Sequence, residues 1–105
     1  MPVQNITEFS EFRNDVLRHG NAIVDFSADW CGPCKRIAPK FQELSELWKN
    51  VRFYKVDIDE VSEAVEEYEV QAMPTFVLFR DGSEISRFAG ANAQKLEEEL
   101  QNHFS

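Results

Sequence analysis

The sequence is poor in cysteine, glycine, proline and positive charge. Its 105 residues include two cysteines, four glycines and four prolines. Secreted domains that rely on disulfides carry more cysteines, spread along the chain. Here the two cysteines stand three positions apart, and closing so short a loop adds only about 2 kcal/mol of stability in the chain-entropy model. The pair is therefore better suited to chemistry than to holding a fold together.

The charge balance excludes other classes of protein. Nineteen acidic residues against eleven basic ones give a formal net charge of −8. Nucleic acids and anionic membranes attract basic surfaces, so we expect neither as a partner. No run is long enough to cross a bilayer, and residues 1–5 lack a basic segment followed by an apolar stretch. We expect a cytoplasmic monomer.

The length and hydrophobic content are those of a small globular protein. A mass of 12.2 kDa allows about two-thirds of the unfolded chain's surface to be buried on folding. Hydrophobic residues make up 43% of the chain, which argues against disorder. We find no repeat, low-complexity tract or linker, so residues 1–105 are expected to form one domain.

Five short apolar runs predict the strands of a sheet. They span residues 3–6, 22–27, 52–58, 75–79 and 84–88. The run at 22–27 is apolar on both faces apart from Asp25, which suggests a central strand covered on both sides. Asp81-Gly82 separates the last two runs and signals a hairpin, so these two strands are predicted to be antiparallel.

Apolar residues at helical spacing predict four helices. The first has Thr7 as its N-cap and stops at Gly20, and the second follows the cysteines and contains Pro39, where we expect a kink. The third covers 61–68, and Asn92 caps the last. Strands separated by helices imply a parallel sheet, to which the hairpin adds an antiparallel edge. The expected fold is α/β, a central mixed five-stranded sheet flanked by four helices in three layers.

The segment Trp30-Cys31-Gly32-Pro33-Cys34 carries the chemistry. It lies between a predicted central strand and a predicted helix, whose N-terminus has free N–H groups and the positive end of the helix dipole. Both stabilise a thiolate. Gly32 lets the backbone turn closely, and Pro33 suits the first helical turn because its missing N–H would have no partner there. We expect Cys31 at the exposed end as nucleophile, and Cys34 one turn in, more buried, as the resolving thiol.

The two cysteines have two other possible roles, as zinc ligands or as inert buried residues. A zinc site needs two further ligands, and the two histidines, His19 and His103, show no metal-binding spacing. We therefore predict no metal. Inert buried cysteines would not need Gly-Pro between them. A Cys-Gly-Pro-Cys segment after Trp, between a strand and a helix, favours a redox-active disulfide.

Five segments of the sequence form a recognisable set in a fixed order: Val24-Asp25-Phe26, Ala28-Asp29-Trp30-Cys31-Gly32-Pro33-Cys34-Lys35, Lys55-Val56-Asp57-Ile58-Asp59, Met73-Pro74-Thr75-Phe76 and Gly90-Ala91-Asn92. With these landmarks the sequence resembles the thioredoxin family over nearly its whole length, and its Met-Pro-Thr-Phe and Gly-Ala-Asn forms resemble animal and fungal cytosolic members. The resemblance implies the thioredoxin fold and a general protein-disulfide reductase.

The resemblance also implies the partners. Electrons would come from NADPH through a flavin (FAD) thioredoxin reductase, and the chain itself would hold no cofactor beyond its Cys31–Cys34 disulfide. The implied clients are of the peroxiredoxin, methionine sulfoxide reductase and ribonucleotide reductase types, together with oxidised cytosolic proteins.

Asp25 is the candidate general base. Burial raises the pKa of a carboxyl, and a base with a near-neutral pKa can take the proton of Cys34; the matching family aspartate has this role. The alternative is a surface aspartate at a strand end. Lys55 matches a family lysine that tunes the aspartate, although a lysine in a strand is usually a surface residue.

Further residues are predicted to bind the client. The family proline that matches Pro74 is cis, and the backbone beside it pairs with an extended client segment; otherwise Pro74 is an ordinary loop proline. Trp30 is expected to be exposed, although tryptophans usually pack in the core. The expected docking surface comprises Trp30, Gly32, Pro33, Ala72, Met73, Gly90 and Ala91. Ala72 stands where many animal members have a cysteine, which excludes regulation through that thiol.

Two other functions remain open at this point. An oxidase or isomerase on the same fold usually has a histidine between its cysteines, whereas Pro33 favours a reductant. A binding module without catalysis would tolerate loss of Cys34. The acidic clusters Glu66-Glu67-Glu69 and Glu97-Glu98-Glu99 are expected to form solvated helix faces.

Overall fold

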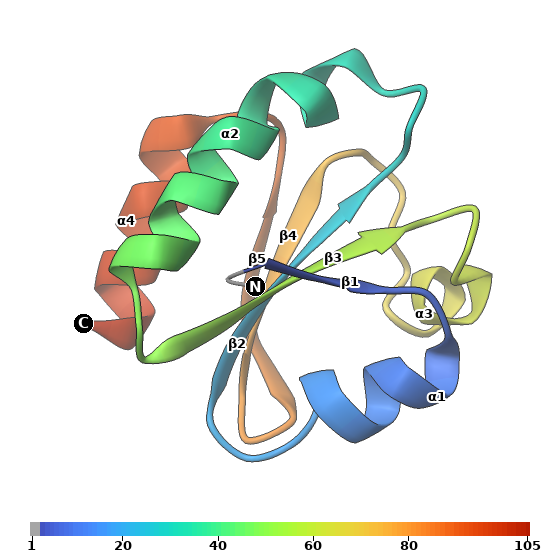
Figure 1. The fold of residues 1–105 in the computed structure, drawn as a ribbon, viewed down its shortest axis with the longest axis horizontal. Helices are drawn as coiled ribbons and strands as arrows, with labels where there is room; N and C mark the ends of the chain where they lie inside the picture. Colours follow the sequence, from blue (N-terminus) through green and yellow to red (C-terminus); the bar gives the residue numbers. More distant parts are fainter. Residues whose placement is uncertain (1–2) are drawn as a thin grey trace.

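The computed structural model describes residues 3–105, and a five-stranded sheet lies at its centre (Figure 1). The strands are β1 (Val3–Ile6), β2 (Asn21–Ser27), β3 (Val51–Asp57), β4 (Thr75–Arg80) and β5 (Ser83–Ala89). Their spatial order is β1-β3-β2-β4-β5. The first three are parallel, whereas β4 and β5 are antiparallel to their neighbours. The predicted mixed sheet is confirmed.

The central position of β2 explains its sequence. Six of its seven residues are buried, because β3 and β4 flank it and helices cover both of its faces. The turn between β4 and β5 follows the hairpin prediction. Asp81 and Gly82 both have positive φ angles, 53° and 84°, as a two-residue type I′ turn requires.

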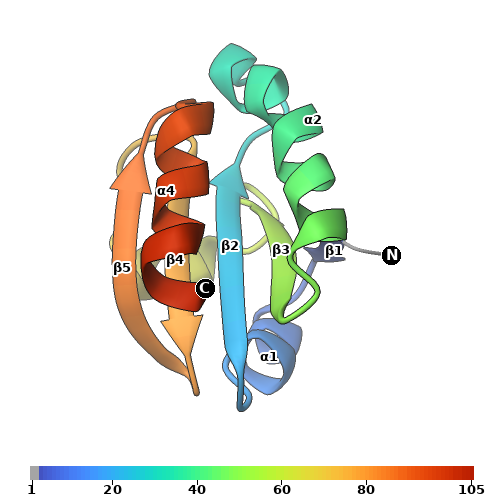
Figure 2. The ribbon, with the colours of Figure 1, turned by 90° about the vertical axis from the view of Figure 1, so that its left-hand side faces the viewer.

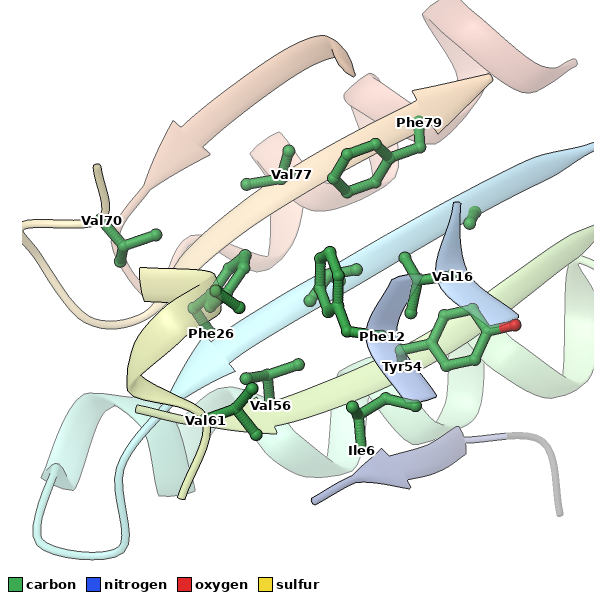
Figure 3. Packing of buried hydrophobic residues seen from close by; sticks show 13 residues of the cluster. Ile6, Phe12, Val16, Phe26, Tyr54, Val56, Val61, Val70, Val77 and Phe79 are labelled. Carbon is green, nitrogen blue, oxygen red and sulfur yellow. The ribbon is translucent and has the colours of Figure 1, made fainter. Parts of the chain in front are cut away.

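Helices lie on both sides of the sheet (Figures 1 and 2). One face carries α2 (Gly32–Leu47) and α4 (Ala93–Phe104), and the other carries α1 (Phe9–Glu11) and α3 (Ser62–Glu67). Each face has its own hydrophobic cluster. Figure 3 shows the cluster under α1 and α3, where Phe12 packs between Phe26 and Phe79. The Tyr68 ring also packs against Phe12. These two clusters fix β2, and therefore the segment that follows it.

The first predicted helix differs from expectation. Thr7 is not its N-cap: the helix begins at Phe9 after Glu8, and the Thr7 N–H donates to the Glu11 carboxylate. After Glu11 the chain continues as a wider π-helical turn, Phe12–Val16. The guanidinium of Arg52 donates to three carbonyls at the end of this turn, those of Val16, Arg18 and His19. Arg52 thereby satisfies the carbonyls that a helix end leaves free.

Helices α2 and α4 lie where the sequence predicts them. Helix α2 continues through Pro39. The Asn92 side chain accepts from the Lys95 N–H at 3.0 Å, which confirms the predicted cap of α4.

Candidate active site

Cys31 and Cys34 lie at the junction where β2 ends and α2 begins. They form a disulfide, with their Cα atoms 5.3 Å apart. Cys31 is the N-cap of α2, and its Sγ accepts a hydrogen bond of 3.2 Å from the Cys34 N–H. Pro33 occupies the first turn, where no N–H donor is required. This N–H and the helix dipole both favour negative charge on the Cys31 sulfur.

Cys31 is more buried than the sequence suggested, whereas Cys34 is buried as predicted. Cys31 retains 6% of its accessible surface and Cys34 retains 3%. The prediction that Cys31 is exposed is therefore wrong. Ala28 belongs to the same cluster, and Ile58 and Met73 pack against it. Loops from the ends of three strands therefore surround the disulfide. The order of burial agrees with the prediction, since Cys34 is the deeper of the two.

A loop from β4 lies against the disulfide. The Met73–Pro74 bond is cis, as the resemblance implied. The Met73 carbonyl oxygen lies 3.8 Å from Cys31 Sγ. The Pro74 carbonyl accepts from the Gly90 N–H at 2.9 Å, and Gly90 has a φ of 106°, a conformation that favours glycine. The backbone before β4 therefore lies next to Cys31, and the backbone after β5 is bonded to it.

Trp30 is one of two large hydrophobic residues that the described chain exposes, with 66% of its surface accessible. The predicted exposure is confirmed. Its Nε1 donates a 3.0 Å hydrogen bond to Asp59 Oδ2. Asp59 is not among the predicted site residues, because it lies 29 positions from Trp30 in the sequence. It comes close to Trp30 because it follows β3, the parallel neighbour of β2.

The remaining predicted docking residues lie on the same loops. Gly32 and Ala72 are exposed, whereas Pro33, Met73, Gly90 and Ala91 are half-buried. The Ala72 carbonyl accepts from the Thr75 hydroxyl at 2.5 Å, which fixes the loop before β4. All but Trp30 lack polar side-chain atoms. Of these residues, Met73 packs against the disulfide cluster. The seven predicted docking residues, Trp30 included, are called the weakly polar rim below.

Asp25 is buried in β2, with 1% of its surface accessible. Its Oδ1 is the one fully buried side-chain nitrogen or oxygen in residues 3–105 that has no hydrogen-bond partner. Burial raises the pKa of Asp25 from 3.8 to about 7, while the charge of Lys55 acts in the opposite direction. Lys55 is its register partner on β3. The surface alternative for Asp25 is therefore wrong, and Lys55 lies where its charge acts on this carboxyl.

The two acidic clusters behave differently. Glu66, Glu67 and Glu69 are exposed as expected. Glu99 is not: it retains 6% of its surface and accepts a 2.5 Å hydrogen bond from the Ser86 hydroxyl on β5. The expectation of a fully solvated face at 97–99 is therefore wrong, because position 99 lies one turn from both Leu96 and His103 on the side of α4 that faces the sheet.

Within residues 3–105 no three His, Cys, Asp or Glu side chains are grouped as a metal site would require. Over the same residues, no helix combines the length and the apolar character needed to span a bilayer.

Comparisons with known proteins identify the family. The family model described as "Thioredoxin" matches residues 3–102. Thioredoxin Asp f 29 of Aspergillus fumigatus is 47% identical over 104 residues, covering 96% of this chain and 94% of that protein. Thioredoxin-2 of Pyricularia oryzae is 46% identical over 97 residues, covering 92% of this chain but only 57% of the Pyricularia protein.

Solved structures agree. Malassezia sympodialis thioredoxin superimposes with a TM-score of 0.92 at 39% identity, covering 98% of this chain and 91% of that one. Another neighbour comes from a study of thiol resolution in a yeast mitochondrial 1-Cys peroxiredoxin via glutathione and thioredoxin systems. Its TM-score is 0.89 at 40% identity, covering 95% of this chain and 94% of that chain.

Proposed function

The chain belongs to the thioredoxin family, and we propose that it acts as one domain that reduces client protein disulfides through Cys31 and Cys34. The disulfide at the N-terminus of α2, with the Cys34 N–H on Cys31 Sγ, is the observation that carries this proposal. It is the oxidised product that such a reaction leaves on the protein.

The reaction has two thiol–disulfide exchanges. In the reduced protein the Cys31 thiolate attacks one sulfur of the client disulfide, and the other client sulfur leaves as a thiolate that takes a proton from solvent. Cys34 then loses its proton and attacks Cys31 Sγ. The bond between Cys31 and the client breaks, and the second client thiol is released. Two electrons have passed from the protein to the client.

Asp25 is proposed to take the proton of Cys34. A pKa of about 7 means that the carboxyl can both accept a proton and return it near neutral pH. Its Oδ1 lacks a hydrogen-bond partner that would hold it in one protonation state. Lys55, paired with Asp25 in the β2–β3 register, tunes this pKa downwards.

The client is proposed to lie along the backbone at Met73–Pro74 as an extended segment. Main-chain pairing of this kind accepts many sequences. The weakly polar rim supports the proposal, since it offers contact area without selecting one charge pattern. It comprises Trp30, Gly32, Pro33, Ala72, Met73, Gly90 and Ala91.

The partners follow from the family. We propose re-reduction by a thioredoxin reductase that draws electrons from NADPH through FAD, with no cofactor bound to this chain. Clients of the peroxiredoxin, methionine sulfoxide reductase and ribonucleotide reductase types are proposed, and the yeast peroxiredoxin study supports the first. We also propose that the chain is a cytoplasmic monomer. Its net charge of −8 disfavours binding to nucleic acid or to anionic membranes.

The proposal is tested by NADPH consumption with a thioredoxin reductase and a protein disulfide substrate. The wild-type protein should support turnover, and Cys34→Ser should stop it while accumulating a mixed disulfide on Cys31. Cys31→Ser is the matched control, because it should neither turn over nor trap a client. A wild-type protein that supports no turnover, and whose Cys34→Ser variant binds clients equally well, would instead be a binding module. A reduction potential in the range of protein disulfide isomerase would identify an oxidase or isomerase.

A further inference from the structure

The sulfur atoms of the chain are concentrated at one place. The sequence has two cysteines and two methionines, and three of these four residues lie together: Met73 packs against the cluster that contains Cys31 and Cys34. The other methionine, Met1, stands outside the described residues. Met73 therefore brings a thioether to the edge of the candidate site.

The Met73 side chain bridges two apolar clusters. It packs against the cluster of the disulfide and also against the cluster under α1 and α3. It is half-buried, so part of it reaches solvent. Its backbone carbonyl oxygen lies 3.8 Å from Cys31 Sγ, in the segment proposed to pair with the client. A chemical change of this side chain therefore acts directly on the docking surface.

The sulfur atoms of the site differ in reactivity towards hydrogen peroxide. In the reduced protein the Cys31 thiolate is the strongest nucleophile, so it takes an oxygen atom first and hydroxide leaves. Cys34 then displaces that oxygen as water, and the disulfide results. No free cysteine remains in the disulfide form over residues 3–105. Met73 is then the oxidisable sulfur that is left at the site.

We propose that Met73 is an oxidation site, at which hydrogen peroxide weakens client docking once Cys31 and Cys34 are already joined. The inference rests on the proposed function. The Met73 sulfur attacks one oxygen of the peroxide, and the O–O bond breaks. The sulfur loses two electrons and becomes a sulfoxide, while the second oxygen takes the proton of the first and leaves as water.

A sulfoxide does not suit the place that the thioether occupies. Its oxygen is a hydrogen-bond acceptor, whereas the side chains on the disulfide side, those of Ala28, Ile58 and the two bonded cysteines, have no N–H or O–H to donate. Burying a polar group without a partner is costly, so the oxidised side chain should turn towards solvent. The weakly polar rim then loses an apolar contact beside Cys31.

The test compares the wild-type protein before and after treatment of its disulfide form with hydrogen peroxide. The peroxide is removed, and peptide mass spectrometry locates the added oxygen. Both samples are then reduced with dithiothreitol, which leaves the sulfoxide in place, desalted and mixed with a protein disulfide client. Rapid quench gives the second-order rate constant of client reduction, which should fall about fivefold in the treated protein because an apolar contact of the rim is lost.

Met73→Leu separates the thioether from the shape of the side chain. Leucine is apolar and of similar volume, and the variant retains Met1, so any effect of oxidation at Met1 appears in it as well. Whatever the rate constant of this variant is, it should be the same before and after peroxide. In treated wild-type protein, two methionine sulfoxide reductases, one for each epimer of the sulfoxide, should restore the original value.

Three results would overturn the inference. They are added oxygen on Met1 without any on Met73, an unchanged rate constant in protein that carries the Met73 sulfoxide, and an equal loss in Met73→Leu. Failure of the proposed function looks different, because the untreated wild-type protein would then reduce no client disulfide.

Discussion

Two carboxyl groups are buried on the α2–α4 face of the sheet, and their surroundings differ. Glu99 accepts a hydrogen bond from Ser86 and lies 3.5 Å from the Lys95 ammonium and 3.6 Å from His103 Nε2. Asp25 has no partner on Oδ1 and lies on the floor of a cavity. Burying a carboxyl without partners is costly, so a protein that keeps one gains something other than stability from it.

The comparison separates a structural acid from an acid proposed to act in the reaction. A hydrogen bond and nearby cations hold Glu99 in place between α4 and β5. None of these partners belongs to the site around the disulfide. Asp25 lies beneath the helix that carries Cys34, and its pKa of about 7 suits proton exchange at neutral pH. Changing each carboxyl should therefore have opposite consequences for turnover and for stability.

The largest difference is expected in turnover. Asp25→Asn removes the proposed base with little change in shape, and resolution of the mixed disulfide should slow by about 100-fold at neutral pH. Glu99→Gln is the matched amide substitution and should leave the rate unchanged. Rapid-quench analysis of the mixed disulfide measures both. Equal rates in Asp25→Asn and wild type would remove Asp25 from the mechanism.

The second difference concerns stability as a function of pH. The pKa of Asp25 is higher in the folded protein than in the unfolded chain, so the folded state binds the proton more tightly. Stability therefore falls as pH rises from about 4 to about 7, and this loss is complete above the folded pKa. Asp25→Asn escapes the loss and should be more stable than wild type at about pH 8, by at most about 4 kcal/mol. Urea unfolding of the oxidised proteins at low and high pH measures this, and a gain that does not grow with pH would contradict it.

Glu99 should show the reverse behaviour. Glu99→Ala leaves the Ser86 hydroxyl without its partner and should lower the free energy of unfolding by about 1–3 kcal/mol. Glu99→Gln keeps an acceptor and should lose less. Urea unfolding of both variants, together with unchanged disulfide reduction, checks the structural assignment. Reduced turnover in the folded Glu99→Ala protein would contradict a purely structural role for Glu99.

The smallest effect is expected at Lys55. Its charge lowers the pKa of Asp25, so Lys55→Gln should move the pH dependence of resolution to higher pH. The maximal rate at high pH should change little, because the base itself remains. Arg52→Gln tests a cation on the same strand that donates to the Tyr54 hydroxyl and to carbonyls at the end of the π-helical turn. It should leave the pH profile in place.

Much of the fold could be predicted from patterns within single segments. The five apolar runs correspond to the five strands, Asp81-Gly82 forms the hairpin turn, and Asn92 caps α4. Local signals fail where a distant group decides the outcome. The wide turn after Glu11 ends on carbonyls that are held by Arg52, which lies more than thirty positions away.

In the candidate site, too, some features follow from neighbouring residues and others depend on residues far away in the sequence. The chemistry of Cys31 and Cys34 follows from adjacent residues, and the break that Asp25 makes in an apolar strand was enough to predict its burial. The hydrogen bond between Trp30 and Asp59 depends on strand order, which no local pattern encodes. The burial of Glu99 had a weak signal, since it lies three residues after Leu96 on the apolar stripe, but its two acidic neighbours concealed it.

The most direct test of the contrast between the two acids is the titration of Asp25 itself. Carbon-13 NMR of the Asp25 side-chain carboxyl in the oxidised protein follows this one group, and Asp25→Asn assigns its signal. The account predicts a midpoint at about pH 7, as expected for a buried carboxyl without partners. A midpoint at the ordinary value of an exposed aspartate, near 3.8, would contradict it.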